Sequence, residues 1–218
     1  YEIMPSLVGS EMCIRDRQML PPVLEHMKAQ GHAVFEDGDY NLNLFGIRSP
    51  SRDSDEFDDA FGCAYKKKGA WIVEYWPITT DPGKKLLEKP INKKGAAILC
   101  PGQYRGVYRI DKHSRKYLAL CQRDGPVTVY RDDNKDSILD MDESNKQTGM
   151  FGINIHKRNG RGTKVRASSA GCQVFKEVDD FMRLMILAST QVEKRGWDTF
   201  TYTLLDQWWG EHESLPSV

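Results

Sequence analysis

The sequence predicts a mainly β fold of the α+β class, with a short helix near its start and a long helix near its end. Short apolar runs recur along the chain between clusters of Gly, Pro, Asp and Asn, a pattern typical of antiparallel sheets. Apolar and polar residues alternate strictly over residues 151–156. Apolar residues at helical spacing occur in two segments, of which the second is long.

The first expected element is a helix over residues 21–30. Val23, Leu24 and Met27 have helical spacing there, and Gly31 follows as a stop signal. Lys67-Lys68-Gly69 predicts a hairpin, and Asp81-Pro82-Gly83 predicts a further turn. Between such turn signals we expect eight strands, over residues 32–35, 41–48, 62–66, 70–77, 96–100, 106–110, 117–122 and 127–131.

Residues 151–156 are expected to form a strand with two different faces. The apolar residues would face the core, whereas Asn154 and His156 would share the opposite face and could line a site. A closing strand is expected over residues 199–204. Between them a helix is predicted over residues 176–194, ended by Gly196, with an apolar stripe made of Phe181, Leu184, Met185, Ala188 and Val192.

The 218 residues are enough for one sizeable core, and no internal repeat or low-complexity linker divides them. We therefore expect a single domain over residues 18–210, followed by a tail over 211–218. Residues 1–17 are treated separately, because Leu7 to Arg17 resemble a translated sequencing adapter joined to a gene from metagenomic reads. This segment, with Cys13, is set aside from the fold prediction.

Composition excludes several classes of protein. The chain has 31 basic and 31 acidic residues, so its zero net charge predicts no general attraction to nucleic acid or membranes. No apolar run is long enough to span a bilayer. The other cysteines lack CxxC spacing, which argues against a zinc ribbon. Cys63, Cys100 and Cys121 lie in apolar surroundings typical of small core residues, and Cys172 lies in a Gly-containing turn.

His156 and Cys172 are the strongest candidates for catalysis. A cysteine thiol beside a histidine can act as a nucleophile with its base, forming a thioacyl intermediate with a carbonyl compound. The turn from Ser169 through Gly171 to Cys172 could direct backbone N–H groups, including that of Cys172, at the resulting oxyanion.

The spacing of His156 and Cys172, with Ser169 and Gly171 before the cysteine, resembles the L,D-transpeptidase catalytic domain of the YkuD type. The resemblance covers roughly residues 106–204. It implies a β-sandwich with a helix after the catalytic cysteine, and a cysteine-dependent L,D-peptidase or L,D-transpeptidase activity on peptidoglycan stem peptides. Cys172 would be the nucleophile and His156 its base, and no cofactor would be required.

Three positions depart from this family's pattern. Ala170 stands where the family usually has His, Val174 where it has Arg or Asn, and Lys157 where Gly is common. These changes keep nucleophile and base but alter positions that bear on substrate geometry and the acyl acceptor. Residues 41–48 also resemble proteins of gut phages and prophages, which favours hydrolysis of the cell wall. Such a protein would be made in the cytoplasm, without a detectable signal peptide, and would act on the wall.

Asn154, His113 and the basic loop over residues 157–166 are candidates for substrate binding. Arg158, Arg161 and Arg166 of this loop could bind stem-peptide carboxylates, and its cations would lower the pKa of Cys172. The simpler interpretations are a solvated loop and a surface histidine. RNA binding is disfavoured, because no aromatic residue interrupts the charges.

The segment from Asp132 to Glu143 has the spacing of a calcium-binding loop. Oxygen-bearing side chains occupy alternating positions of the kind that Ca²⁺ prefers, and such an ion would have a structural role. Against this, Ser137 stands where the sharp turn needs Gly, and an acidic surface turn is the simpler interpretation. The candidate ligands are Asp132, Asn134, Asp136, Asp140 and Glu143.

Other functions are open to the same residues. The chain could be a non-enzymatic, phage- or wall-associated β-rich binding or structural module in which Cys172 is structural. Papain-like peptidases are disfavoured because they place Cys before His along the chain. A zinc hydrolase using His113, His156 and Cys172 would lack any ligand-pair spacing such as HExxH.

Overall fold

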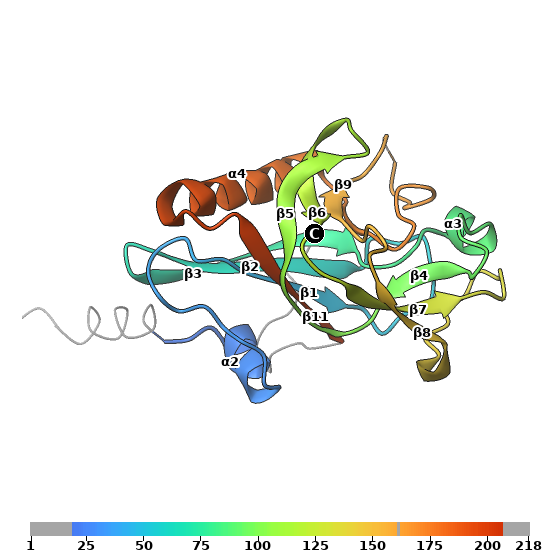
Figure 1. Cartoon of the computed structure of the whole chain (residues 1–218), viewed down its shortest axis with the longest axis horizontal. Coiled ribbons are helices and arrows are strands. Elements are labelled where there is room, and N and C mark those ends of the chain that lie inside the picture. The colour runs from blue at the N-terminus through green and yellow to red at the C-terminus, as the bar shows by residue number, and fades with distance from the viewer. Residues whose placement is uncertain (1–18, 161, 207–218) are drawn as a thin grey trace, which may run out of the picture.

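Two sheets and three helices make up residues 19–160 and 162–206, the part of the chain that the computed structural model describes (Figure 1). The larger sheet closes into a barrel with strand order β1-β11-β5-β6-β9-β10-β3-β2, and the smaller has the order β4-β7-β8. The segments predicted over residues 1–17 and 211–218, and Arg161, lie outside the described residues.

The barrel strands are β1 (Asn43–Arg48), β2 (Asp59–Lys67), β3 (Ala70–Thr79), β5 (Gly102–His113), β6 (Tyr117–Gln122), β9 (Ile155–Lys157), β10 (Gln173–Phe175) and β11 (Thr199–Asp206). The small sheet contains β4 (Ala96–Leu99), β7 (Val127–Asp132) and β8 (Lys146–Gly149), with the 3-10 turn η1 (Glu143–Asn145) before β8. The helices are α2 (Pro22–Ala29), α3 (Lys84–Glu88) and α4 (Val178–Arg195).

Barrel closure depends on two parallel strand pairs inserted among antiparallel ones. Strand β1 pairs with β2 on one side and in parallel with β11 on the other. Strand β10 pairs with β3 and in parallel with β9. The predicted mainly β fold is thus confirmed, but one closed sheet differs from the two packed sheets of the expected sandwich. Because both β1 and β10 have neighbours on each side, the larger sheet has no open edge there.

Helix α2 covers the outer face of the barrel. Its residues Val23, Leu24 and Met27 are buried against Phe45 and Ile47 of β1, and the helix lies below the strands in Figure 1. This packing confirms the helix predicted from their spacing. It also explains why β1 is buried along its whole length, since Leu44 faces the barrel core while Phe45 and Ile47 face the helix.

Helix α4 packs its predicted apolar stripe into the main core. Phe181 makes edge-to-face contacts with Phe175 of β10 and Tyr117 of β6, with ring centroids 5.9 and 6.2 Å apart. Leu184, Met185 and Ala188 are buried with it. Gly196 ends the helix in the left-handed conformation, at φ 70°, as its sequence position predicted.

The differences from the predicted elements have local causes. Residues 32–35 form no strand, because their backbone groups bond side chains: the Asn43 and Gln103 carboxamides accept the N–H groups of Phe35 and Ala33. Strand β8 has the polar sequence Lys-Gln-Thr-Gly, and β10 is only three residues long, so neither gives an apolar signal.

Other sequence predictions agree with the structure. Lys68 and Gly69, at φ 53° and 75°, form the two-residue hairpin turn between β2 and β3, and the Asp39 carboxylate accepts both of their N–H groups. Cys63, Cys100 and Cys121 are buried core residues with free thiols.

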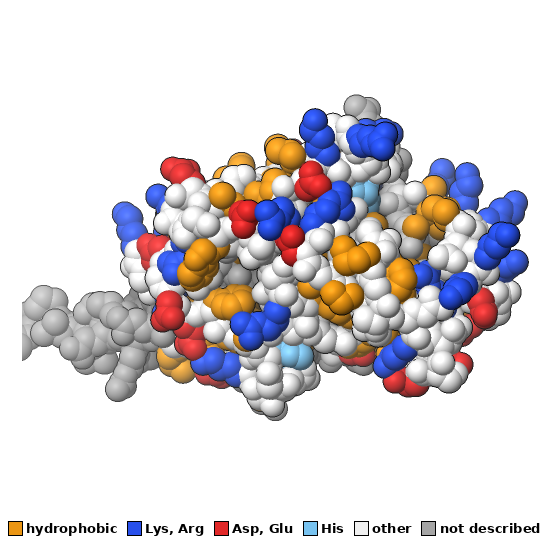
Figure 2. Space-filling model, viewed as in Figure 1, with side chains coloured by type: hydrophobic (Ala, Val, Ile, Leu, Met, Phe, Trp, Pro, Cys, Tyr) orange, Lys and Arg blue, Asp and Glu red, His pale blue; other side chains and the backbone are white. Residues whose placement is uncertain are grey.

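Basic and acidic side chains are interspersed over the face drawn in Figure 2. This distribution agrees with the zero net charge of the chain. Of the helices described, none has the length and apolar character needed to cross a membrane.

The contact between α2 and the barrel gives a test of the fold. We expect Leu24→Ala to lower the free energy of unfolding by about 2–5 kcal/mol, because it leaves a cavity beside Phe45 and Ile47. Urea denaturation measures this change. The neighbouring exposed substitution Glu25→Ala is the control and should shift stability by about 0.5 kcal/mol or less. Equal effects of the two changes would contradict the packing of α2.

Candidate functional site

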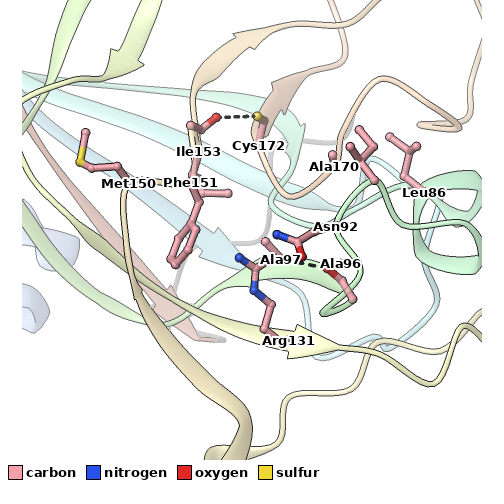
Figure 3. Close-up of a pocket in the computed structure, with 13 residues that line it drawn as sticks. Leu86, Asn92, Ala96, Ala97, Arg131, Met150, Phe151, Ile153, Ala170 and Cys172 are labelled. Carbon is pink, nitrogen blue, oxygen red and sulfur yellow. Dashed lines mark hydrogen bonds between the residues drawn. The ribbon is translucent and has the colours of Figure 1, made fainter.

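Cys172 lies at the wall of a pocket of about 320 Å³, in the turn that leads into β10 (Figure 3). It is partly exposed, whereas the other three cysteines in the described part of the chain are buried. Its thiol donates to the Gly152 carbonyl at 3.5 Å and accepts the Asn154 N–H at 3.4 Å. The thiol is thus held by backbone groups of the segment before β9.

Ser169 and Gly171 shape the turn that carries Cys172. The Ser169 hydroxyl donates to the Cys172 carbonyl at 2.9 Å and accepts the Gly171 N–H at 3.1 Å. Gly171 has φ +115°, and a Cβ there would lie 2.1 Å from the Ala97 carbonyl oxygen, so only glycine fits. Both residues position the cysteine. Among the described residues, no acceptor is bonded to the Cys172 N–H.

The parallel pairing of β9 and β10 brings His156 near Cys172. His156 lies opposite Val174, and the Gln173 N–H donates to the Asn154 carbonyl at 2.9 Å. Alternation along both strands therefore places Asn154, His156 and Cys172 on the same face. Strand geometry puts the Cα atoms of His156 and Cys172 about 8 Å apart. This register agrees with the face predicted for Asn154 and His156 from the sequence.

The His156 imidazole is buried and neutral. Its side chain is 2% exposed, and its Nδ1–H donates to the Lys157 carbonyl at 2.7 Å, so Nε2 carries the lone pair. The Tyr117 hydroxyl lies 3.4 Å from Nδ1 and donates to the same carbonyl at 3.2 Å. Burial, and secondly the neighbouring His113, lower the pKa of His156 to about 4. A backbone carbonyl thus orients the candidate base.

His113 belongs to this group, and the simpler interpretation as a surface loop residue is wrong. It ends strand β5, and its ring stacks on that of His156 with centroids 4.1 Å apart. The Asn154 carboxamide oxygen accepts the Gln122 N–H at 2.9 Å, so its NH₂ group faces His113 and donates to Nδ1 at 3.1 Å. Sequence spacing could not predict this contact, because β5 and β9 are joined only through β6.

Burial also controls the Cys172 thiol, in the direction opposite to that expected. Although the residue is partly exposed, the protein atoms packed around its sulfur raise the pKa of Cys172 to about 11, against the smaller opposing effect of the Asn154 N–H. The prediction that loop cations lower this pKa is therefore wrong. Among the described residues, no hydrogen bond joins the Cys172 thiol to His156. With a raised thiol pKa and a lowered imidazole pKa, both groups are neutral near pH 7.

The basic loop after His156 is bound elsewhere. Lys164 pairs with Glu56, the Arg166 N–H donates to the Asp55 carboxylate, and the Arg158 guanidinium lies over the Phe57 ring at 5.5 Å. These contacts hold the loop against residues 55–57. Arg158 and Arg166 consequently do not line the pocket that contains Cys172.

Gln122, at the end of β6, is a site residue that the sequence analysis missed. Its side-chain oxygen accepts three consecutive N–H groups, those of Phe151, Gly152 and Ile153, at 3.1, 2.8 and 3.1 Å. Its NH₂ group donates to the carbonyls of Gly125 and Gly149, each at 3.0 Å. A buried glutamine before a turn carries no motif, so only the contacts identify its role.

The acidic segment after β7 is a hydrogen-bonded turn. The Asn134 NH₂ group donates to Asp136 and Asp140, at 3.0 and 2.5 Å, so these carboxylates already accept hydrogen bonds within the turn. Asp132 accepts the Asp140 N–H, while Glu143 accepts the Tyr130 hydroxyl and pairs with Lys146. Within the described residues, no group of three or more His, Cys, Asp or Glu side chains could hold a metal ion. The simpler interpretation, an acidic surface turn, fits these contacts.

Comparisons with known family models, curated proteins and solved structures found no match to this chain. The resemblance in the sequence therefore depends on His156, Ser169, Gly171 and Cys172, together with the mainly β fold and the helix that follows them.

Removal of the Gln122 carboxamide should disrupt the pocket wall. We expect Gln122→Leu to lower the free energy of unfolding by about 2–5 kcal/mol, because three N–H groups lose their acceptor. Urea denaturation measures the loss. Gln30→Leu, at an exposed glutamine, is the control. A loss no greater than that of the control would show that the wall is held in another way.

The raised pKa of Cys172 predicts its reactivity. The rate of alkylation by iodoacetamide should rise about tenfold per pH unit from pH 7 to 10 without levelling, since only the thiolate reacts. A free thiol, with a pKa of about 8.5, levels off within this range and serves as the control. The readout is the mass of the Cys172 peptide. A plateau near pH 7 would mean that the thiol is already activated.

Proposed function

We propose that the protein is a cysteine-dependent hydrolase or acyltransferase of peptidoglycan stem peptides, with hydrolysis as the main reaction. The observation that carries the proposal is the parallel pairing of β9 with β10. This pairing supports the proposal because the pocket-lining thiol directly precedes β10 and the oriented imidazole belongs to the neighbouring strand β9.

In the proposed reaction, the Cys172 sulfur attacks the carbonyl carbon of a peptide bond while its proton passes to His156 Nε2. The Cys172 N–H stabilises the oxyanion. The C–N bond then breaks, the leaving amine takes the proton from His156, and a thioester remains. Water then attacks the thioester carbonyl while its proton passes to His156. The C–S bond breaks and releases the carboxylic acid, and the proton on His156 passes to the Cys172 sulfur, which restores the thiol.

The pKa values set a condition on this reaction. The thiol has a pKa of about 11 and the imidazole a pKa of about 4, a difference of about seven units. Transfer of the proton from thiol to imidazole to form the free ion pair therefore costs on the order of 10 kcal/mol. Proton transfer must therefore accompany formation of the C–S bond, as in general base catalysis. A bound substrate that displaces water or brings the imidazole closer would meet this condition.

The substrate class comes from the resemblance to the YkuD-type family, as does the proposal that the barrel is a variant of that fold. The resemblance assigns cleavage or exchange at a bond between L- and D-residues. The resemblance of residues 41–48 to phage and prophage proteins favours water over an amine as acceptor. The cell wall is then the place of action.

A second candidate is a non-enzymatic, phage- or wall-associated β-rich module. The neutral state of Cys172 and the burial of His156 favour it, because an inert thiol in a packed turn has these properties. In that case the pocket would bind a ligand without changing it.

Incubation with purified muropeptides followed by mass spectrometry tests the proposal. We expect products reduced in mass, no activity in Cys172→Ala, and activity lowered about 10²–10⁴-fold in His156→Ala, which lacks the general base. His32→Ala is the matched control and should retain activity, since His32 lies outside the site.

Each outcome decides between the candidates. Products increased in mass by cross-linking would identify a transpeptidase. Unchanged substrates with the wild-type protein would favour the binding module, and wild-type activity in Cys172→Ala would exclude the thiol as nucleophile.

A further inference from the structure

We propose that the pocket beside Cys172 is a carboxylate-binding site in which Arg131 binds the anion and Phe151 holds the guanidinium in place. The ligand would be an amino-acid-sized molecule with a carboxylate and a short aliphatic part. The assignment of this ligand as an acyl donor rests on the proposed function, whereas the binding itself does not.

Arg131 is a buried cation that lines the pocket. It comes from β7 and is 5% exposed, and its guanidinium lies over the Phe151 ring at 4.6 Å. Its Nε donates to Gln147 at 3.1 Å and its Nη1 to the Gly95 carbonyl at 3.3 Å. Figure 3 shows the side chain rising from its strand between Phe151 and Asn92.

The charge of Arg131 has no acidic partner. Across the described ranges, no Asp or Glu carboxylate lies within salt-bridge distance of it, whereas Arg48, Arg109, Arg123 and Arg183 all have one. Neutral acceptors bond two of the guanidinium N–H groups, and the Phe151 ring lies against its face. Burial without a counter-ion nevertheless lowers the pKa of Arg131. A ligand carboxylate would supply the missing partner, and a guanidinium binds carboxylates in a fixed geometry.

The rest of the pocket limits the ligand to a small, partly apolar molecule. Its volume of about 320 Å³ is near the lower end of the range for ligand sites, roughly 300–1,000 Å³. Three small side chains and three larger apolar ones line the pocket together with Cys172. These residues are Ala96, Ala97 and Ala170, and Leu86, Ile91 and Met150.

The position of Arg131 adds a restriction to the proposed reaction. Arg131 and Cys172 line one pocket, so a ligand bound to the cation through its carboxylate presents neighbouring atoms to the thiol. The preferred substrates would then carry a free carboxylate close to the scissile bond. Uncharged amide analogues would bind poorly, because they cannot pair with Arg131. The basic loop is held against residues 55–57 and does not line the pocket, so it offers no other contact to such a ligand.

Binding is tested with N-acetylglycine, its neutral amide N-acetylglycinamide, and inorganic phosphate. The first readout is protection of Cys172 from iodoacetamide at fixed pH, measured on the Cys172 peptide. The second is NMR titration of the Cys172→Ala protein, which binds without reacting. We expect N-acetylglycine to protect and to bind, and the amide to do neither. Equal effects of acid and amide would overturn the proposal, and stronger binding of phosphate would replace it with a general anion site.

Variants locate the anion. Arg131→Gln should weaken N-acetylglycine binding roughly 10- to 100-fold, as expected for loss of a charged hydrogen-bonding partner. Arg109→Gln removes the same charge from an exposed, ion-paired position and should leave binding unchanged. Should Arg131→Gln fail to fold, Arg131→Lys can be used instead. It keeps the positive charge but lacks the planar guanidinium that binds both carboxylate oxygens, so it should still weaken binding. Unchanged binding in a folded Arg131 variant would overturn the assignment.

The two proposals fail separately. Arg131-dependent binding of N-acetylglycine without any turnover of muropeptides would support the carboxylate site and contradict the proposed enzymatic function. Turnover that is unchanged in the Arg131 variants, with no protection of Cys172 by N-acetylglycine, would support the enzymatic function and contradict the carboxylate site.

Discussion

The Gln122 carboxamide is the interaction on which the candidate site depends. The segment from Gly149 to Asn154 belongs to no strand over most of its length, so its backbone needs partners from elsewhere. Gln122 supplies them: its side chain binds the N–H groups of Phe151 to Ile153 and the Gly149 carbonyl, and its own N–H binds the Asn154 side chain. The pocket wall, the acceptor for the Cys172 thiol and the orientation of Asn154 toward His113 all follow from this one residue.

A site built in this way consists of neutral groups. The burial that holds Asn154, His156 and Cys172 together raises the thiol pKa and lowers the imidazole pKa. Of the cations expected to oppose this effect, Lys164 pairs with Glu56 and Arg158 lies over the Phe57 ring, while the Arg166 backbone N–H bonds the Asp55 carboxylate. Among the described residues that line the pocket, only Arg131 carries a charge; it can attract an anionic ligand, but it is not among the causes of the Cys172 pKa shift.

Local periodicity predicted much of this structure from the sequence. The stripe of α4 and the hairpin at Lys68 and Gly69 are properties of neighbouring residues, and the structure confirms them. The strand predicted over residues 151–156 is confirmed only from Ile155 onward, because the preceding backbone bonds the Gln122 side chain instead of a neighbouring strand. Gln122, Arg131 and the stacking of His113 depend instead on contacts between segments 20 or more residues apart, such as Arg131 with Phe151. The basic loop shows the same limit, because its charges were evident but the segment that binds them was not.

The turn before β10 is fixed from two sides, and this restricts how the site could become active. Inside the barrel, Gln173 donates to the Thr80 carbonyl at 3.4 Å and accepts the Tyr202 hydroxyl at 2.8 Å, while Arg48 donates to the Thr80 hydroxyl at 3.0 Å. Outside it, the Gly83 N–H binds the Ser169 carbonyl at 3.0 Å. Ser169, three residues before Cys172, and Gln173, directly after it, are both held by these hydrogen bonds. A large displacement of the thiol would therefore break several buried hydrogen bonds. The His156 ring is held at Nδ1 by Lys157 and Tyr117 and on one face by the His113 ring, but within the described residues no hydrogen bond is made to its Nε2. Any approach of base to nucleophile should consequently come from rotation of the imidazole after a ligand fills the pocket.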